Sequence, residues 1–249
     1  GQENFSFGPG VFKEGKNIQT FEIGLISSQD KIQLANDFFP SILKYKKYFE
    51  YINTIRVVFY YNSRVLQTFS FLGNLTKIVF PEFVHEISPF AFKNCTNLRS
   101  IEFKSEYISK IEKEVFYNCE SLVEITFPDV IETIDSRAFM NCRKLKTIKS
   151  HEQNENSALK ISIIGKEAFK NCSSLESFNI GSGCKSIGSA AFMNCSSLNT
   201  FFLDGSEMKK ISSRIFKNCT SLTSVKIVNL PFINNSINQE PFTSLNYEA

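Results

Sequence analysis

One motif recurs six times in this chain of 249 residues and constrains its fold more than any other feature. Each copy has a phenylalanine, then an asparagine two residues later, a cysteine three residues later and a leucine six residues later. The phenylalanines lie 24, 23, 30, 23 and 24 residues apart and are Phe92, Phe116, Phe139, Phe169, Phe192 and Phe216. An isoleucine precedes each of them by five residues. Self-similarity at this period predicts a solenoid of stacked repeats.

The apolar spacing within each repeat predicts two extended segments joined by a turn. Residues after the leucine alternate with period two, as in Ile101, Glu102 and Phe103, which predicts a short strand. The apolar pair before each phenylalanine, such as Ile108 and Ile111, predicts a shorter extended segment on the opposite side. The Asn-Cys pair favours a turn, because asparagine tolerates a left-handed backbone. Stacking then pairs like strands in parallel, about 4.7–4.9 Å apart.

The period also predicts how the chain is organised. Clear repeats occupy residues 84–227, degenerate ones 51–84, and a truncated repeat 228–249, which together make a solenoid over 51–249. Because the array stops within a repeat, we expect it to continue beyond Ala249. Residues 1–50 fit the period poorly and are interpreted as a partly helical N-terminal cap. Its expected helices are Ser28–Phe39 and a second that Pro40 opens and that runs to Tyr51.

Composition and motifs argue against several classes of function. The net charge of +3 is spread along the chain, which argues against a nucleic-acid partner. No apolar run reaches the length of a membrane-spanning helix. Neither of the two histidines, His85 and His151, lies in a catalytic pattern, and no phosphate-binding or dinucleotide motif is present. We therefore expect no catalytic residues and no cofactor.

The seven cysteines are interpreted as core residues. Six of them share one repeat position, and Cys184 fills a slot that elsewhere holds Val, Ile or Met. Stacked cysteines have parallel Cβ vectors about 5 Å apart, which is wider than the 3.5–4.5 Å that a disulfide prefers. A linear column without a C-x-x-C pair also does not make a tetrahedral zinc site. We expect small buried hydrophobic side chains and no metal.

Copies such as Ile134–Leu145 resemble the BspA-like, or Treponema pallidum-type, leucine-rich repeat over about residues 66–249. The Ala-Phe-x-Asn-Cys-x-x-Leu core carries this resemblance. It implies an α/β-type repeat solenoid, mostly β with short turns or helices, that is curved and right-handed with parallel strands on its concave face. Members of the family are commonly surface or secreted proteins associated with adhesion to host proteins, cells or matrix.

The residues between the strand anchors point outward from the concave face and are the candidate partner-binding residues. The eight selected positions are Arg56, Lys77, Glu102, Glu124, Lys149, Asn179, Phe202 and Lys226. Their mixed charges argue against a groove for a simple polyanion. Phe202 is either an exposed aromatic contact or a side chain that rotates inward or packs beneath a loop.

Two further features stay open. About seven polar residues are inserted around Ser150–Lys160, either as part of a binding surface or as a tolerated loop. N-x-S/T motifs at Asn94, Asn171, Asn194 and Asn218 reflect turn chemistry or glycosylation, and Asn74 and Asn234 would be better acceptors.

The sequence favours a non-enzymatic recognition or adhesion protein that binds a protein or a cell-surface or matrix macromolecule. It would lie at the cell surface or be secreted, without membrane insertion in this segment. An intracellular scaffold for protein–protein interaction, in the cytoplasm, is the alternative.

Overall fold

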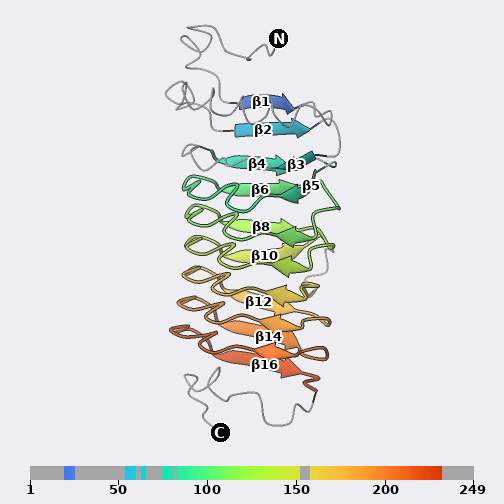
Figure 1. Ribbon diagram of the computed structural model, residues 1–249. Helices are drawn as coiled ribbons and strands as arrows, with labels where there is room; N and C mark the ends of the chain where they lie inside the picture. Colours follow the sequence, from blue (N-terminus) through green and yellow to red (C-terminus); the bar gives the residue numbers. More distant parts are fainter. Residues whose placement is uncertain are drawn as a thin grey trace.

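The chain folds into a solenoid of stacked coils joined by parallel β-strands, as a computed structural model shows (Figure 1). It describes residues 75–80, 82, 84–151 and 158–231, and the backbone of three earlier strands, β1 (Thr20–Leu25), β2 (Thr54–Phe59) and β3 (Ser63–Val65). Connections within these ranges are turns, and the described part contains no helix. The expected parallel solenoid is confirmed.

Each coil contributes one long strand to one side. The long strands are β4 (Lys77–Phe80), β6 (Ser100–Phe103), β8 (Glu124–Phe127), β10 (Thr147–Ser150), β12 (Ser177–Ile180), β14 (Thr200–Asp204) and β16 (Ser224–Val228). They form two sheets, of order β1-β2-β4-β6-β8-β10 and β12-β14-β16. We call their outward side the long-strand face.

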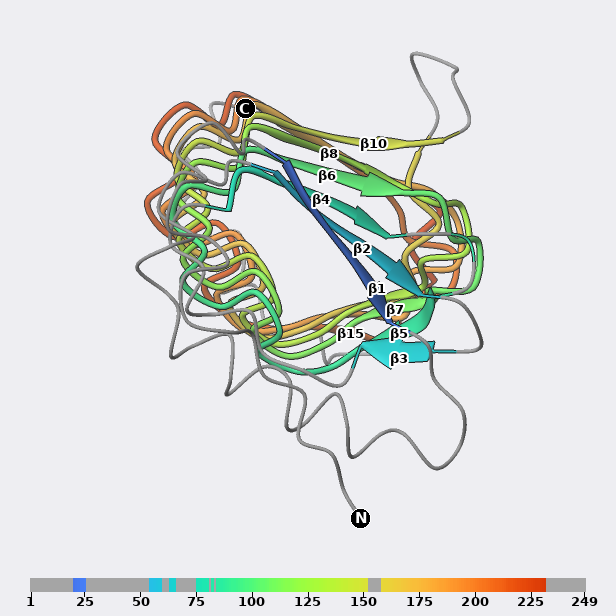
Figure 2. The same cartoon turned by 90° about the horizontal axis from the view of Figure 1, so that it is seen from above.

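Strands of two residues, and one of four (β5), line the opposite side of the coils (Figure 2). They are β5 (Val84–Ile87), β7 (Lys110–Ile111), β9 (Thr133–Ile134), β11 (Ile163–Ile164), β13 (Ser186–Ile187) and β15 (Lys210–Ile211). The last five form one continuous sheet, β15-β13-β11-β9-β7, and β5 pairs with β3. We call the outward side of β5 to β15 the short-strand face.

The repeated residues form continuous buried columns between these sides. The six phenylalanines stack with ring centroids 5.3–6.0 Å apart from one coil to the next. In the adjacent cysteine column, each thiol from Cys119 onward donates to the carbonyl of the preceding coil's phenylalanine at 3.1–3.3 Å. The register that the sequence predicts, with Ile101 opposite Ile125, is confirmed.

The asparagine column closes the turn side of the coils. All six asparagines have φ between 60° and 67°, which confirms the predicted left-handed turn. Their side-chain amides also bond to one another along the stack, from Asn118 to Asn94 at 2.9 Å through to Asn218 to Asn194 at 2.8 Å. The expected N-terminal helices lie outside the described residues. Within 1–50, β1 pairs in parallel with β2 and so extends the long-strand side.

The two contributions of an asparagine in this column can be separated at Asn141. Its amide donates to Asn118 and accepts from Asn171, both at 2.6 Å. Asn141→Gly keeps the left-handed backbone but removes both bonds, so we expect a loss of about 1–3 kcal/mol in unfolding free energy. Asn141→Ala adds a left-handed penalty of about 1 kcal/mol or more.

Denaturant unfolding tests the expected order of stability, with wild type above Asn141→Gly and Asn141→Gly above Asn141→Ala. Equal stability of Asn141→Ala and wild type would show that neither the amide bonds nor the backbone conformation contributes.

Candidate partner-binding face

The outward residues of the long strands form two parallel rows. Strand register places Val79 opposite Glu102, Thr126 opposite Lys149, and Phe202 between Asn179 and Lys226. This central row therefore holds Glu102, Lys149, Asn179, Phe202 and Lys226 of the predicted residues. Lys77 and Glu124 lie two residues earlier on their strands, in an outer row. Arg56 pairs with Glu22 on β1, and its side chain lies outside the described part.

The N-terminal half of the long-strand face, from β4 to β10, carries charges, some of which neutralise one another. Lys77 lies 3.0 Å from Glu102, whose other oxygen is 3.9 Å from Lys104. Such exposed pairs contribute little to stability. Glu124 and Lys149 are exposed and form no ion pair with a described residue.

The C-terminal half is nearly neutral and includes an aromatic side chain. Phe201 and Leu203 point into the core, so Phe202 between them points outward and is half-buried. It therefore does not rotate inward. An outer row of three exposed hydroxyl groups runs beside it, from Ser177, Thr200 and Ser224. The two halves of the face thus offer different chemistry.

The boundary between the two halves of the long-strand face lies between β10 and β12, where one sheet ends and the next begins. We call this boundary the seam. These neighbouring strands share no ladder, and one backbone hydrogen bond, Glu176 N to Lys146 O at 3.2 Å, joins them where they begin. Leu159, which is buried, pairs with Ile180 instead of a residue of β10. Its N–H donates to Asn179 O, and its carbonyl accepts from Gly181 N, both at 2.9 Å. The inserted residues therefore follow the end of β10 at Ser150, and the chain rejoins the sheet at Leu159, beside β12.

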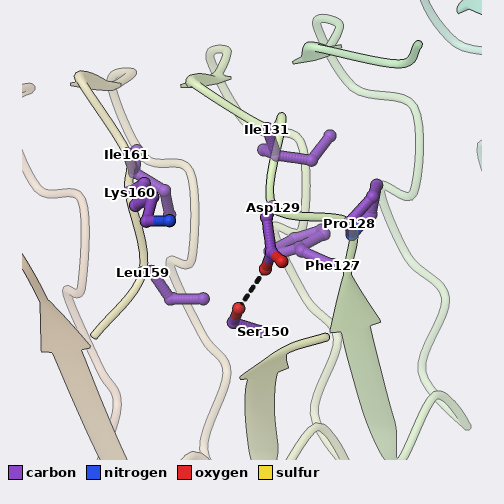
Figure 3. Close-up of a pocket in the computed structure, with 8 residues that line it drawn as sticks. All are labelled: Phe127, Pro128, Asp129, Ile131, Ser150, Leu159, Lys160 and Ile161. Atoms are coloured by element: carbon purple, nitrogen blue, oxygen red, sulfur yellow. Dashed lines mark hydrogen bonds between the residues drawn. The ribbon is translucent and has the colours of Figure 1, made fainter. Parts of the chain in front are cut away.

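A small hollow lies beside the seam (Figure 3). Its lining is mostly apolar and comes from Phe127, Pro128, Asp129, Ile131, Ser150, Leu159, Lys160 and Ile161. The Ser150 hydroxyl bonds to the Asp129 carboxylate across it. Nearby on β12, the side-chain oxygen of Asn179 is enclosed and has no hydrogen-bond partner in the described structure. The inserted residues 152–157 lie outside the described part.

The cysteines are buried in the core and are not positioned as nucleophiles or metal ligands in the described structure. All seven are buried, and none forms a disulfide. Burial raises the pKa of the Cys95 thiol to about 12, and the pKa values of Cys184 and Cys219 to about 11. Across the described ranges, no three His, Cys, Asp or Glu side chains gather as metal ligands. His85 stacks on Tyr107 at 4.4 Å, and His151 is exposed beside the insertion.

A second feature, which the repeat pattern did not predict, is a ladder of alternating charges on the turn side. Glu114 is only 6% exposed and lies between Lys93, at 2.7 Å, and Arg137, at 3.6 Å. Arg137 also binds Glu167 at 2.7 Å, and Glu167 binds Lys170 at 2.9 Å. These ion pairs lower the pKa of Glu167 and raise that of Arg137. The sequence does contain a signal for this ladder, because Glu114, Arg137 and Glu167 alternate in charge at the same repeat position.

Comparison with known proteins identifies the class and the family. The architecture is that of a parallel β-solenoid of leucine-rich repeats. Six copies of the BspA type leucine rich repeat region match residues 66–159 and 156–248, so the chain belongs to this family. No curated protein matches the chain.

Solved structures with similar folds are distant in sequence. The leucine-rich repeat protein of T. pallidum is 18% identical, with TM-score 0.49, over 73% of this chain and 78% of that one. A leucine-rich cell surface protein of Faecalibacterium prausnitzii is 22% identical, with TM-score 0.46, over 72% of this chain. The matched region spans 62% of the length of the F. prausnitzii protein. Among the described residues, no helix is long and apolar enough to cross a membrane.

Thiol chemistry tests the buried cysteine column. A rise in pKa from 9.0 to about 12 lowers the thiolate fraction of Cys95 about a thousandfold near neutral pH. We expect almost no reaction with a thiol reagent in the folded protein and seven reactive thiols after denaturation.

Fewer than seven thiols in denaturant without a reductant would reveal disulfides. Rapid reaction of several thiols in the folded protein would place the column at the surface.

Proposed function

We propose that this chain is a non-enzymatic recognition module that binds a macromolecular partner through the long-strand face. The observation that carries the proposal is the central row of that face. A rigid parallel sheet holds Lys149, Asn179, Phe202 and Lys226 outward, while the alternate side chains are used in the core. Residues fixed on strands give a binding surface that changes little on association.

The partner we propose is a protein or another macromolecule of a cell surface or extracellular matrix. The family resemblance supports this partner class, an adhesive role, and a surface or secreted location. An intracellular scaffold with the same face is the second candidate. Seven unbridged thiols favour it modestly, because disulfides are common in small secreted domains.

Phe202 is the proposed energetic centre of the contact. Truncated aromatic hot spots typically cost 2 kcal/mol or more, which corresponds to a loss of affinity of about 30-fold. We expect Phe202→Ala to weaken binding by about this factor. Reversing two exposed charges in the same row, with Lys149→Glu and Lys226→Glu, should further weaken it.

The experiment captures ligands separately from extracellular matrix and from cell lysate, then measures affinity for each purified partner. Lys217→Ala is the control, because Lys217 is exposed and comes from a turn before β16, outside both the long-strand and the short-strand face. Unchanged affinity in both the Phe202 and the charge-reversed variants would refute the long-strand face as the contact surface. Partners found only in lysate would favour the scaffold.

A further inference from the structure

Charge is segregated along the short-strand face. We include the loops that flank its strands, so that its N-terminal half comprises residues 82–90, 104–114 and 128–137 and its C-terminal half comprises 158–167, 181–190 and 204–214. The N-terminal half has eight acidic and four basic residues. The C-terminal half has three acidic and six basic residues. The solenoid therefore has an acidic half and a basic half on one side.

The exposed charges keep this contrast. The acidic half exposes four carboxylates and two cations, which are Glu82, Glu106, Asp129, Glu132, Lys104 and Lys113. Its Lys110 is held by Glu112 at 2.7 Å and Asp135 at 3.0 Å, which leaves that cation compensated. In the basic half all six cations are exposed: Lys160, Lys166, Lys185, Lys209, Lys210 and Arg214. One of them, Lys185, lies 3.9 Å from Glu207.

An apolar side chain stands at the boundary between the halves. Ile163 is 42% exposed on β11, the middle strand of the five-stranded sheet. Strand register places it between the small polar residues Thr133 and Ser186. The centre of the face thus has one exposed apolar side chain flanked by short polar ones, which suits close contact with another surface.

We propose that a second copy of this chain binds the short-strand face about a two-fold axis that runs along the strand direction between β9 and β11. This rotation reverses the solenoid axis, so the three acidic coils of one copy face the three basic coils of the other, twice. It brings the coil of Glu132 against the partner copy's coil of Lys166, and places the two Ile163 side chains near the axis. A two-fold along the solenoid axis would set acid against acid and is disfavoured.

The face is large enough for a stable dimer. Six coils about 4.8 Å apart extend about 24 Å along the solenoid, and about nine residues per coil extend roughly 27 Å across it. The product, roughly 600–700 Å² from each copy, reaches the lower range of standard protein–protein interfaces. An isologous contact of this kind is the commonest symmetry among soluble oligomers.

Such a dimer would present both long-strand faces outward, because the long and short strands lie on opposite sides of each coil (Figure 2). Two partner sites in one particle raise the apparent affinity for a surface with repeated ligands. The dimer itself does not depend on the proposed partner, so the two proposals fail independently.

Sedimentation of the full chain across the micromolar range tests the proposal. We expect a dimer that dissociates as sodium chloride rises to about 0.5 M, because exposed charges are screened. Ile163→Asp should raise the dissociation constant more than about tenfold, whereas Ile163→Val should change it by less than about threefold. Phe202→Ala should leave it unchanged.

A charge-swap pair tests the orientation. Glu82→Lys, Glu106→Lys and Glu132→Lys together leave five acidic and seven basic residues in the acidic half, so that both halves become basic. Lys166→Glu, Lys185→Glu and Lys209→Glu together leave six acidic and three basic residues in the basic half, so that both halves become acidic. Each triple variant alone should be monomeric, and their equimolar mixture should form heterodimers, since acid again faces base in both contacts. All six positions are exposed, so folding should survive, which thermal melting verifies.

A wild-type chain that stays monomeric at low salt would overturn the proposal. So would a dimer that is indifferent to salt and to both Ile163→Asp and the charge changes. Loss of both homodimers without recovery in the mixture would reject the antiparallel arrangement.

Discussion

The structure depends on hydrogen bonds between one coil and the next. On the turn side, the backbone N–H groups of Asn118, Asn141 and Asn171 each donate to a carbonyl of the following coil at 2.8–2.9 Å. The phenylalanine two residues earlier does the same, as from Phe116 to Ala138 at 2.9 Å. Buried backbone groups need partners, and in a coil this short they find them in a neighbour. An isolated repeat would therefore be unstable, and the array is the folding unit.

Much of this was predictable from the sequence, because one repeat fixes many positions at once. Columns such as Phe139 between Phe116 and Phe169 follow from spacing alone, and so do the parallel register and the buried cysteines. The left-handed turn at Asn141 also followed, since asparagine favours it. Left-handed backbone at Glu114 and Arg137 did not, because nothing in those residue types signals it. Tertiary hydrogen bonds, such as Glu114 N to Ser136 O at 3.1 Å, hold it there.

The candidate surfaces were predictable in part. Alternation along a strand correctly placed Phe202 and Lys226 outward, because a parallel ladder leaves no choice of face. The seam was not predictable, since Ser150 fits the strand pattern and only the fold shows that Leu159 takes the core position. The acidic and basic halves of the short-strand face were equally hidden. They arise from residues up to 132 positions apart, Glu82 to Arg214, that stacking brings onto one surface.

Amide hydrogen exchange resolved by residue tests the central claim, that successive coils are joined in register, most directly. The coil-to-coil bonds predict slow exchange, at a rate set by cooperative unfolding of the array, for the amides of Asn118, Asn141, Asn171 and Asn194. Exchange of these amides at the rate of an unstructured peptide, in protein that is otherwise folded, would contradict the stacked-coil account.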